Sequence, residues 1–215
     1  MKLYLKQLEL GFLQNFVYLI GSPETHEVAV VDPGWDVPLI LQTAAQDEMR
    51  ITTVIVTHTH LDHINGVEEI VQATDAQVIV HKKESSELSM VEGSNLKPVE
   101  GEQEIALGPL VLKFLHTPGH TPGSQCIMVG DRLISGDTLF IGGCGRCDLP
   151  GGDAETLYNS LSRLSHLDDR LVVCPGHNYA SAPTSTLEKE KSLNPFLKAQ
   201  GLDGFLNLVG AVKKK

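Results

Sequence analysis

Three histidines and one aspartate lie within six consecutive residues of this chain, in the segment His-Thr-His-Leu-Asp-His. They are His58, His60, Asp62 and His63. Neutral imidazole and carboxylate groups are ligands that zinc, iron and manganese accept. Four ligands this close together cannot easily surround one ion. Two ions can share them, with His58 and His60 facing one ion and Asp62 and His63 facing the other, so the segment predicts a metal-binding loop.

Three further candidate ligands occur downstream, and each follows an apolar run that reads as a strand. They are His120 after residues 111–115, Asp137 after residues 132–134, and His177 after residues 171–174. Glycine and proline around them allow sharp turns that point a side chain back over the strand end. The complete set fits two adjacent sites, namely His58, His60 and His120 in the first, and Asp62, His63 and His177 in the second. Asp137 is the expected bridge, because one carboxylate has two oxygens.

The remaining histidines and the cysteines lack this setting. His26, His81, His116 and His166 are expected to be surface or hydrogen-bonded core residues. Cys144 and Cys147 form a C-x-x-C, but no strand-then-helix pattern of a thioredoxin motif surrounds it, and no second C-x-x-C completes a zinc site. Together with Cys126 and Cys174, they are expected to be reduced thiols.

The composition limits the classes of function. The chain has 215 residues, is 41% hydrophobic and 20% charged, and carries a net charge of −10. It is therefore long enough for a full core, and its acidity disfavours nucleic-acid and anionic-membrane partners. No apolar run reaches the roughly 18 residues of a membrane-spanning helix, and residues 1–10 lack the apolar centre of a signal peptide. We expect a cytoplasmic protein; the sequence does not indicate its oligomeric state.

Apolar patterning predicts strands interleaved with helices. The predicted strands are residues 3–10, 16–20, 28–31, 54–57, 78–80, 111–115, 125–129, 132–134 and 171–174. One predicted helix begins at Pro38. Three others cover residues 66–74, 154–164 and 186–199. This order favours two sheets packed face to face with helices outside, in a single domain over residues 1–215. A short helical segment is expected at about 186–212, followed by a frayed, solvated tail at residues 212–215.

Taken together, these motifs resemble the metallo-β-lactamase superfamily over residues 16–196. The resemblance implies an α/β fold, a four-layer αββα sandwich of two mixed β-sheets with helices outside and the metal site at one edge. β-Lactamases commonly use a cysteine at the bridging position, where this chain has Asp137. That difference disfavours a true β-lactamase, and the acidic balance disfavours the RNA-processing members.

The chain is most similar to the glyoxalase II and persulfide dioxygenase branch, whose substrates are glutathione adducts. The similarity is carried by residues 136–140 with 143–146, by 176–179 and by 190–198. It implies that Arg146, Tyr179 and Lys198 hold a glutathione-like thiol carrier, whose carboxylates pair with Arg and Lys. Two features depart from glyoxalase II. Only about forty residues follow His177, where a longer helical domain is usual, and Arg146-Cys147-Asp148 resembles the Arg-x-Asp of the dioxygenase.

The resemblance leaves two enzymatic hypotheses open. The favoured one is a hydroxyacylglutathione hydrolase-like thioesterase with two divalent ions, zinc first and iron or manganese as alternatives, in which Asp62 also orients the attacking hydroxide. The alternative is a persulfide dioxygenase with one Fe(II) held by His58, His120 and Asp137. A non-catalytic metal-binding or scaffold protein is a third interpretation. Metal stoichiometry separates the first two.

Overall fold

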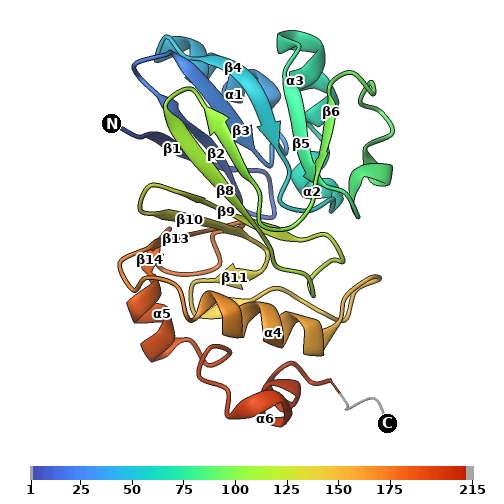
Figure 1. Ribbon diagram of the computed structural model, residues 1–215, viewed down its shortest axis with the longest axis vertical. Helices are drawn as coiled ribbons and strands as arrows, with labels where there is room; N and C mark the ends of the chain where they lie inside the picture. Colours follow the sequence, from blue (N-terminus) through green and yellow to red (C-terminus); the bar gives the residue numbers. More distant parts are fainter. Residues whose placement is uncertain (1, 212–215) are drawn as a thin grey trace.

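Two six-stranded sheets form the centre of the computed structural model, which describes residues 2–211 (Figure 1). The first sheet has the strands β1 (Tyr4–Leu10), β2 (Asn15–Ser22), β3 (Glu27–Val31), β4 (Arg50–Ile55), β5 (Gln77–His81) and β6 (Leu96–Val99), in that order. The second has the order β14-β13-β10-β9-β8-β7, with β7 (Glu104–Leu107), β8 (Leu110–His116), β9 (Gln125–Val129), β10 (Arg132–Gly136), β13 (Val172–Pro175) and β14 (Ser185–Thr186). A small hairpin pairs β11 (Leu139–Phe140) with β12 (Gly143–Cys144).

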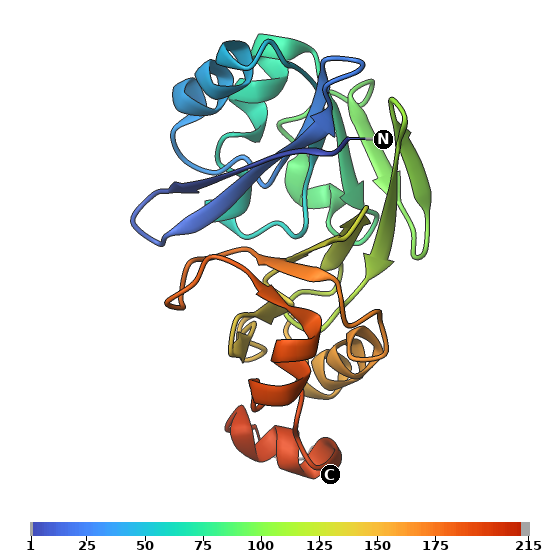
Figure 2. The same ribbon diagram turned by 90° about the vertical axis from the view of Figure 1, so that its left-hand side faces the viewer.

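Helices cover the outer faces of both sheets (Figures 1 and 2). The helices of the described residues are α1 (Val37–Gln46), α2 (Leu61–Ile64), α3 (Val67–Thr74), the 3₁₀ helix η1 (Ser85–Leu88), α4 (Ala154–Leu164), α5 (Leu187–Leu193) and α6 (Gly201–Leu208), of which α6 packs against α4. Three apolar layers result. In β2, Val17 and Leu19 face the helical layer, whereas Phe16, Tyr18 and Ile20 face the second sheet, because successive strand residues point to opposite faces. This arrangement confirms the predicted αββα sandwich.

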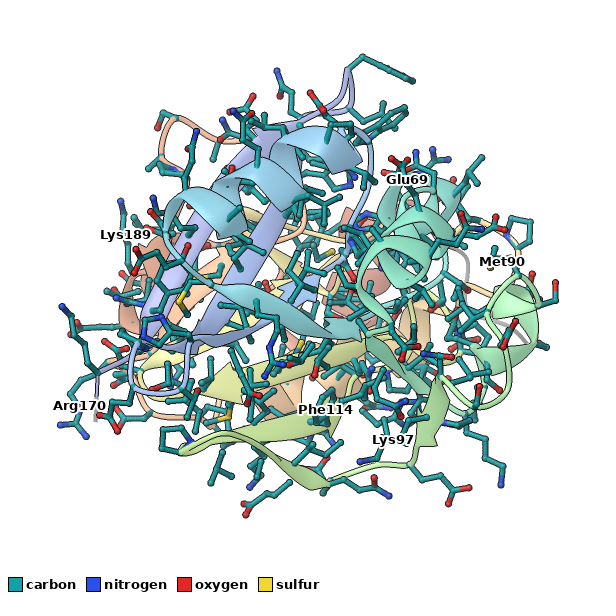
Figure 3. The ribbon with its side chains drawn as sticks, turned by 90° about the horizontal axis from the view of Figure 1, so that it is seen from above. Glu69, Met90, Lys97, Phe114, Arg170 and Lys189 are labelled. Atoms are coloured by element: carbon teal, nitrogen blue, oxygen red, sulfur yellow. The ribbon has the colours of Figure 1, made fainter. Side chains whose placement is uncertain are left out.

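The middle layer is the interface between the two sheets. Tyr18 and Ile20 meet Phe114 and Ile127 there, and all four are at most 1% exposed. Figure 3 labels Phe114 within the interior, while the Arg170 side chain extends outward. The third layer packs Leu157, Leu161 and Leu164 of α4 against the outer face of the second sheet. Their i, i+4, i+7 spacing explains why this helix can be predicted from the sequence.

Parallel pairing brings several strand ends to one edge. β3 and β4 are parallel, with Val31 opposite Ile55, and β10 and β13 are parallel, with Gly136 opposite Pro175. Both sheets also contain antiparallel pairs, so both are mixed, as predicted. The carboxyl ends of parallel strands meet at the same edge of a sheet, so the segments that follow β4, β10 and β13 are brought together there.

The C-terminal region differs from the prediction. The predicted helix over residues 186–199 is wrong beyond Leu193, where α5 ends and Asn194 takes an extended conformation. Pro195 explains this end, because a proline disfavours helical geometry in the residue before it. A separate helix, α6, follows. The predicted frayed tail, residues 212–215, lies outside the described residues. Within residues 2–211, no helix is both long enough and apolar enough to cross a membrane.

Candidate metal centre

The structure brings all seven predicted ligands to one edge of the sandwich. His58 and His60 follow β4, and Asp62 and His63 lie in the short helix α2. His120 follows β8, Asp137 follows β10, and His177 follows β13. The side chains of His58, His63, His120 and His177 are buried. Strands of both sheets therefore present these groups from the segments that follow them.

The first group consists of three imidazoles. Nδ1 of His60 lies 3.1 Å from Nε2 of His58 and 3.0 Å from Nε2 of His120. Three nitrogens bound to one zinc ion at about 2.1 Å in tetrahedral geometry would be roughly 3.4 Å apart. The observed separations are close to that spacing, so His58, His60 and His120 can hold a metal ion.

The second group consists of two imidazoles and a carboxylate. The Nε2 atoms of His63 and His177 are 3.1 Å apart, and Oδ2 of Asp62 lies 3.5 Å from each of them. These three ligand atoms can also surround one ion. A further cluster of Asp32, His58 and His63 shares residues with both groups. Its Asp32 oxygens are already occupied by hydrogen bonds from Thr57 and His63.

Asp137 lies between the two groups. Its Oδ2 is 3.6 Å from Nε2 of His120 and 3.4 Å from Nε2 of His177, and its Oδ1 is 3.5 Å from Nε2 of His63. Oδ1 is buried and has no hydrogen-bond partner within residues 2–211. A buried carboxylate oxygen without a partner is costly unless a cation pairs with it. The orphaned oxygen therefore fits a metal centre with two ions, and Asp137 has the position expected of a bridging ligand.

Hydrogen bonds to Nδ1 set the orientation of the second pair of rings. His63 donates from Nδ1 to Oδ2 of Asp32 at 3.0 Å, and His177 donates from Nδ1 to the carbonyl of Leu13 at 2.9 Å. When both rings are neutral, their Nε2 lone pairs face each other across 3.1 Å. That arrangement is repulsive unless a cation or a shared proton lies between them. It is the arrangement in which imidazole binds a metal.

The first group has equivalent supports. His120 Nδ1 donates to the carbonyl of Arg146 at 2.6 Å. His58 Nδ1 contacts the hydroxyl of Thr57 at 3.0 Å, and that hydroxyl donates to Asp32 at 2.6 Å. Because the hydroxyl proton is used toward Asp32, the oxygen accepts from His58. The Nε2 atoms of His58 and His120 are thus left with lone pairs that point toward His60.

The histidines of the two groups differ in the direction in which their pKa values are shifted. Burial lowers the pKa of His58 well below its ordinary value and also lowers the pKa of His60, so both rings are neutral near pH 7. Burial opposes protonation of His63 too, but the carboxylates of Asp137 and Asp32 outweigh it and raise its pKa to about 9. Without an ion, a proton takes the place of the positive charge in the second group.

Three residues that support the centre were not predicted. Asp32 lies directly after β3. Asn15 donates from Nδ2 to Oδ2 of Asp62 at 2.8 Å, and Trp35 fixes the amide by donating to its Oδ1 at 2.8 Å. Glu84 contacts the loop that carries His58 and His60. Asp32 could have been noticed as a carboxylate at a strand end, but Asn15 and Glu84 carry no sequence signal.

The predicted substrate residues have three different surroundings. Tyr179 is 59% exposed and stacks on His177, with ring centroids 4.7 Å apart and planes 9° apart. Arg146 is engaged by Asp148 through two hydrogen bonds of 2.9 and 2.8 Å. Lys198 is exposed in the turn after α5. Tyr179 is therefore placed beside the metal ligands, whereas the guanidinium of Arg146 already has an acidic partner.

A hollow of about 290 Å³ adjoins the centre on the Arg146 side. It is lined by Cys144, Gly145, Arg146, Cys147, Asp148, Phe196, Leu208 and Val209. Gly145 connects it to the ligands, because a Cβ there would lie 1.8 Å from the carbonyl oxygen of Asp137 and 3.1 Å from Cγ of His120. Only glycine permits this close approach.

The residues expected to be outside the centre are outside it. His81 and His116 stack on each other with centroids 4.0 Å apart, and His26 and His166 contact backbone carbonyls. None of these four belongs to a ligand cluster within residues 2–211. All four cysteines are free thiols, as predicted. Burial raises the pKa of Cys144 to about 12, which leaves its thiol protonated at neutral pH.

Comparison with known proteins agrees with the fold and the ligand pattern. The family model described as metallo-beta-lactamase superfamily matches residues 10–177, which include all seven predicted ligands. The chain belongs to the metallo-beta-lactamase superfamily. It is a metal-dependent, hydrolase-like member, and its His and Asp clusters are consistent with a dinuclear site. Members of this superfamily with different activities are among its relatives.

Two curated relatives are hydrolases. The chain is 33% identical over 175 residues to a probable polyketide biosynthesis zinc-dependent hydrolase, PksB, from Bacillus subtilis, covering 81% of this chain and 77% of that one. It is 36% identical over 170 residues to a hydroxyacylglutathione hydrolase from Anaeromyxobacter dehalogenans. That match covers 78% of this chain but 62% of the relative.

Two solved structures are similar over most of the chain. The ETHE1 structure from Myxococcus xanthus has a TM-score of 0.88 and 31% identity, covering 99% of this chain and 92% of that one. TTHA1623, solved in a di-iron-bound form, has a TM-score of 0.78 and 31% identity, covering 89% of this chain and all of the other (100%). Zinc and two iron ions are thus both represented among proteins similar to this chain.

Proposed function

We propose that the protein is a dinuclear metal hydrolase that cleaves the thioester of a small thiol, with a hydroxyacylglutathione-like substrate. The observation that carries this proposal is the position of Asp137 between two three-ligand groups, with a buried Oδ1 that lacks a hydrogen-bond partner in the part of the chain that the structure describes. In this assignment, His58, His60 and His120 hold one ion, and Asp62, His63 and His177 hold the other. Asp137 is shared by both.

Two bound divalent ions would supply a hydroxide nucleophile at neutral pH and a Lewis acid for the thioester carbonyl. The protein's own contribution is orientation. Asn15 pins Oδ2 of Asp62 next to His63 and His177. Asp62 is then placed to accept a hydrogen bond from the attacking water and to direct it toward the carbonyl carbon. No serine or cysteine nucleophile is required.

The surroundings of the centre support a substrate with a flat or apolar portion and carboxylates. The exposed ring of Tyr179, stacked on His177, offers a contact surface beside the ligands. Arg146 lines the adjoining hollow together with Phe196. In our proposal, Arg146, Tyr179 and Lys198 contact the thiol carrier, and a substrate carboxylate competes with Asp148 for the guanidinium of Arg146. A relative named hydroxyacylglutathione hydrolase supports the same assignment.

A persulfide dioxygenase with one Fe(II) is the second candidate function. The contact between Arg146 and Asp148 favours it, because the Arg-x-Asp pattern resembles that of the dioxygenase. The TM-score of 0.88 to an ETHE1 structure also supports it, because a relative from Bos taurus that is 32% identical over 194 residues is named persulfide dioxygenase ETHE1. His58, His120 and Asp137 would then be the iron ligands, with Oδ2 of Asp137 lying 4.0 and 3.6 Å from Nε2 of His58 and His120, respectively.

Metal content and two assays on the same preparation test the proposal. We expect two ions per chain, hydrolysis of S-D-lactoylglutathione and no oxygen uptake with glutathione persulfide. The Asp62→Ala variant should lose one ion and nearly all turnover, whereas Leu61→Ala, which alters the exposed neighbouring residue, should keep both ions. One iron per chain with stoichiometric oxygen uptake would replace the hydrolase by the dioxygenase.

A further inference from the structure

Glu84 is a buried carboxylate between two metal-binding loops. It lies after β5, directly before η1, and is 4% exposed. Its Oε2 accepts hydrogen bonds from the backbone nitrogen of Thr59, at 3.2 Å, and from the hydroxyl of Thr59. Its Oε1 accepts one from the backbone nitrogen of Gly123 at 2.7 Å. One side chain therefore connects two loops that are far apart in the sequence.

The two loops are those that supply the whole first group. Thr59 separates His58 from His60, and Gly123 ends the turn that carries His120. A shift of either contact changes the distance between His60 and His120, whose ring nitrogens are only 3.0 Å apart. Glu84 is thus placed to set the size of the first site without being one of its ligands.

Glu84 fits against the loop that carries His120 and Gly123 without free space. A Cβ at residue 123 would lie 2.3 Å from Cγ of Glu84 and 2.8 Å from its Oε1. Glycine is therefore required at this position for the carboxylate to reach the backbone. Burial raises the pKa of Glu84, but hydrogen bonds from Thr59, Thr121 and Gly123 outweigh burial and lower it. The carboxylate is thus ionised, and each of these donors is matched to an acceptor.

The second group has supports of its own. Asp32 orients His63, the carbonyl of Leu13 orients His177, and Asn15 holds Asp62. None of these three hydrogen bonds involves Glu84. The two metal sites share Asp137 and the hydrogen bonds of Asp32 with Thr57 and His63, but Glu84 contacts only the loops of the first group. A change at Glu84 should therefore affect the two sites unequally.

We propose that Glu84 is a positioning residue that fixes the spacing of the His58–His60 and His120 loops and so sets the metal affinity of the first site selectively. This role goes beyond the thioester reaction, because it concerns metal binding before any substrate is present. It also bears on a dioxygenase with one ion, because Glu84 connects the loops that carry His58 and His120.

The test uses Glu84→Gln in two backgrounds. A glutamine has nearly the same shape, but its amide nitrogen must face a backbone or hydroxyl donor, so one contact becomes repulsive. In the His177→Ala background, which disables the second site, we expect Glu84→Gln to weaken Zn²⁺ binding about 10- to 100-fold, measured by competition with a chelator. In the His60→Ala background, which disables the first site, we expect little change. Equal losses in both backgrounds, or none in either, would overturn the proposal.

Three further variants separate positioning from general destabilisation. Glu100→Gln makes the same chemical change at an exposed carboxylate that pairs with Lys82, and it should leave both affinities unchanged. If Glu84→Gln does not fold, Thr59→Val removes only the hydroxyl that donates to Glu84. We expect Thr59→Val to weaken first-site binding several-fold and Thr59→Ser to restore it. Wild-type affinity in Thr59→Val, with Glu84→Gln unfolded, would count against the proposal.

Discussion

Asp32 accepts a hydrogen bond from Nδ1 of His63 at 3.0 Å, and this contact determines which nitrogen of His63 faces the second metal site. The same carboxylate accepts from the backbone nitrogen and the hydroxyl of Thr57, at 2.7 and 2.6 Å. Thr57 in turn accepts from His58. A chain of hydrogen bonds therefore runs from His58 through Thr57 and Asp32 to His63, behind both sites. Asp32 lies in the middle of this chain, and its two oxygens accept three hydrogen bonds from Thr57 and His63.

Replacing Asp32 by asparagine should therefore weaken the second site. The new amide nitrogen would donate where the carboxylate accepts, which favours the His63 tautomer with its proton on Nε2, the wrong nitrogen to protonate for metal binding. We expect Asp32→Asn to lose affinity for the second ion about 10- to 100-fold in a chelator competition. Asp131→Asn, at an exposed carboxylate, is the matched control. Unchanged binding of two ions by Asp32→Asn would refute this role of Asp32.

Removal of metal should lower thermal stability. Without an ion, the buried Oδ1 of Asp137 has no hydrogen-bond partner within residues 2–211, and the Nε2 atoms of His63 and His177, 3.1 Å apart, have only a proton to share. An ion that binds only the folded state at 100 times its Kd adds about 2.7 kcal/mol of stability. For a chain of this size, that corresponds to about 5–10 °C in Tm. We expect the metal-free protein to melt lower by about that amount and to recover on addition of Zn²⁺. Equal melting temperatures with and without metal would mean that no ion binds here.

The ligands could be predicted from sequence because residues of metal-binding type occur directly after predicted strands. His120, Asp137 and His177 each follow a readable strand, and the carboxyl ends of strands meet at one edge. The supports could not be predicted. Glu84 is 25 residues from Thr59 and 39 from Gly123, and it lies in a charged segment that looks solvated. Its burial results from how β5 and the loop after β8 come together, which depends on tertiary packing.

The C-terminal helix shows a second limit. Residues 186–199 have a helical composition, and a single proline decides where α5 ends. Tertiary contacts then hold the residues at this end in place. Asn194 is fully buried and donates to the carbonyls of Phe140 and Gly143, at 3.2 and 2.9 Å. Glu190 accepts from the backbone nitrogen of Gly142 at 2.7 Å. Side chains that looked like part of a solvated helix thus fix the hairpin next to the metal centre.

Acid should destabilise the protein partly through His81. Burial and the stacked ring of His116 lower the pKa of His81 to about 4, against an ordinary value of 6.5. Between those two pH values, only the unfolded chain binds the extra proton. The contribution is therefore fully present above about pH 6.5 and is lost as the pH falls toward 4. One pKa unit corresponds to about 1.4 kcal/mol, so we expect a loss of at most about 3 kcal/mol over this window.

The His81→Phe variant isolates this contribution, because phenylalanine keeps a ring against His116 but does not titrate. Urea unfolding of metal-free wild type and variant at pH 7.5, 6, 5 and 4 measures the difference. We expect the unfolding free energy of the variant to fall less steeply with decreasing pH, with the comparison at pH 7.5 as the baseline. Parallel pH profiles would assign the acid sensitivity to other groups.

Tyr179 should contribute to substrate binding through its hydroxyl and to the metal centre through its ring. Tyr179→Phe keeps the ring stacked on His177 and removes only the hydroxyl. A lost hydrogen bond of about 1 kcal/mol corresponds to a roughly fivefold higher KM for S-D-lactoylglutathione with kcat nearly unchanged. Tyr179→Ala removes the ring as well, so we expect kcat to fall too, because His177 loses its stacking partner. Tyr158→Phe, on α4 against Phe205, is the matched control and should leave both constants unchanged. An unaltered KM in Tyr179→Phe would remove the hydroxyl from the proposed binding of the thiol carrier.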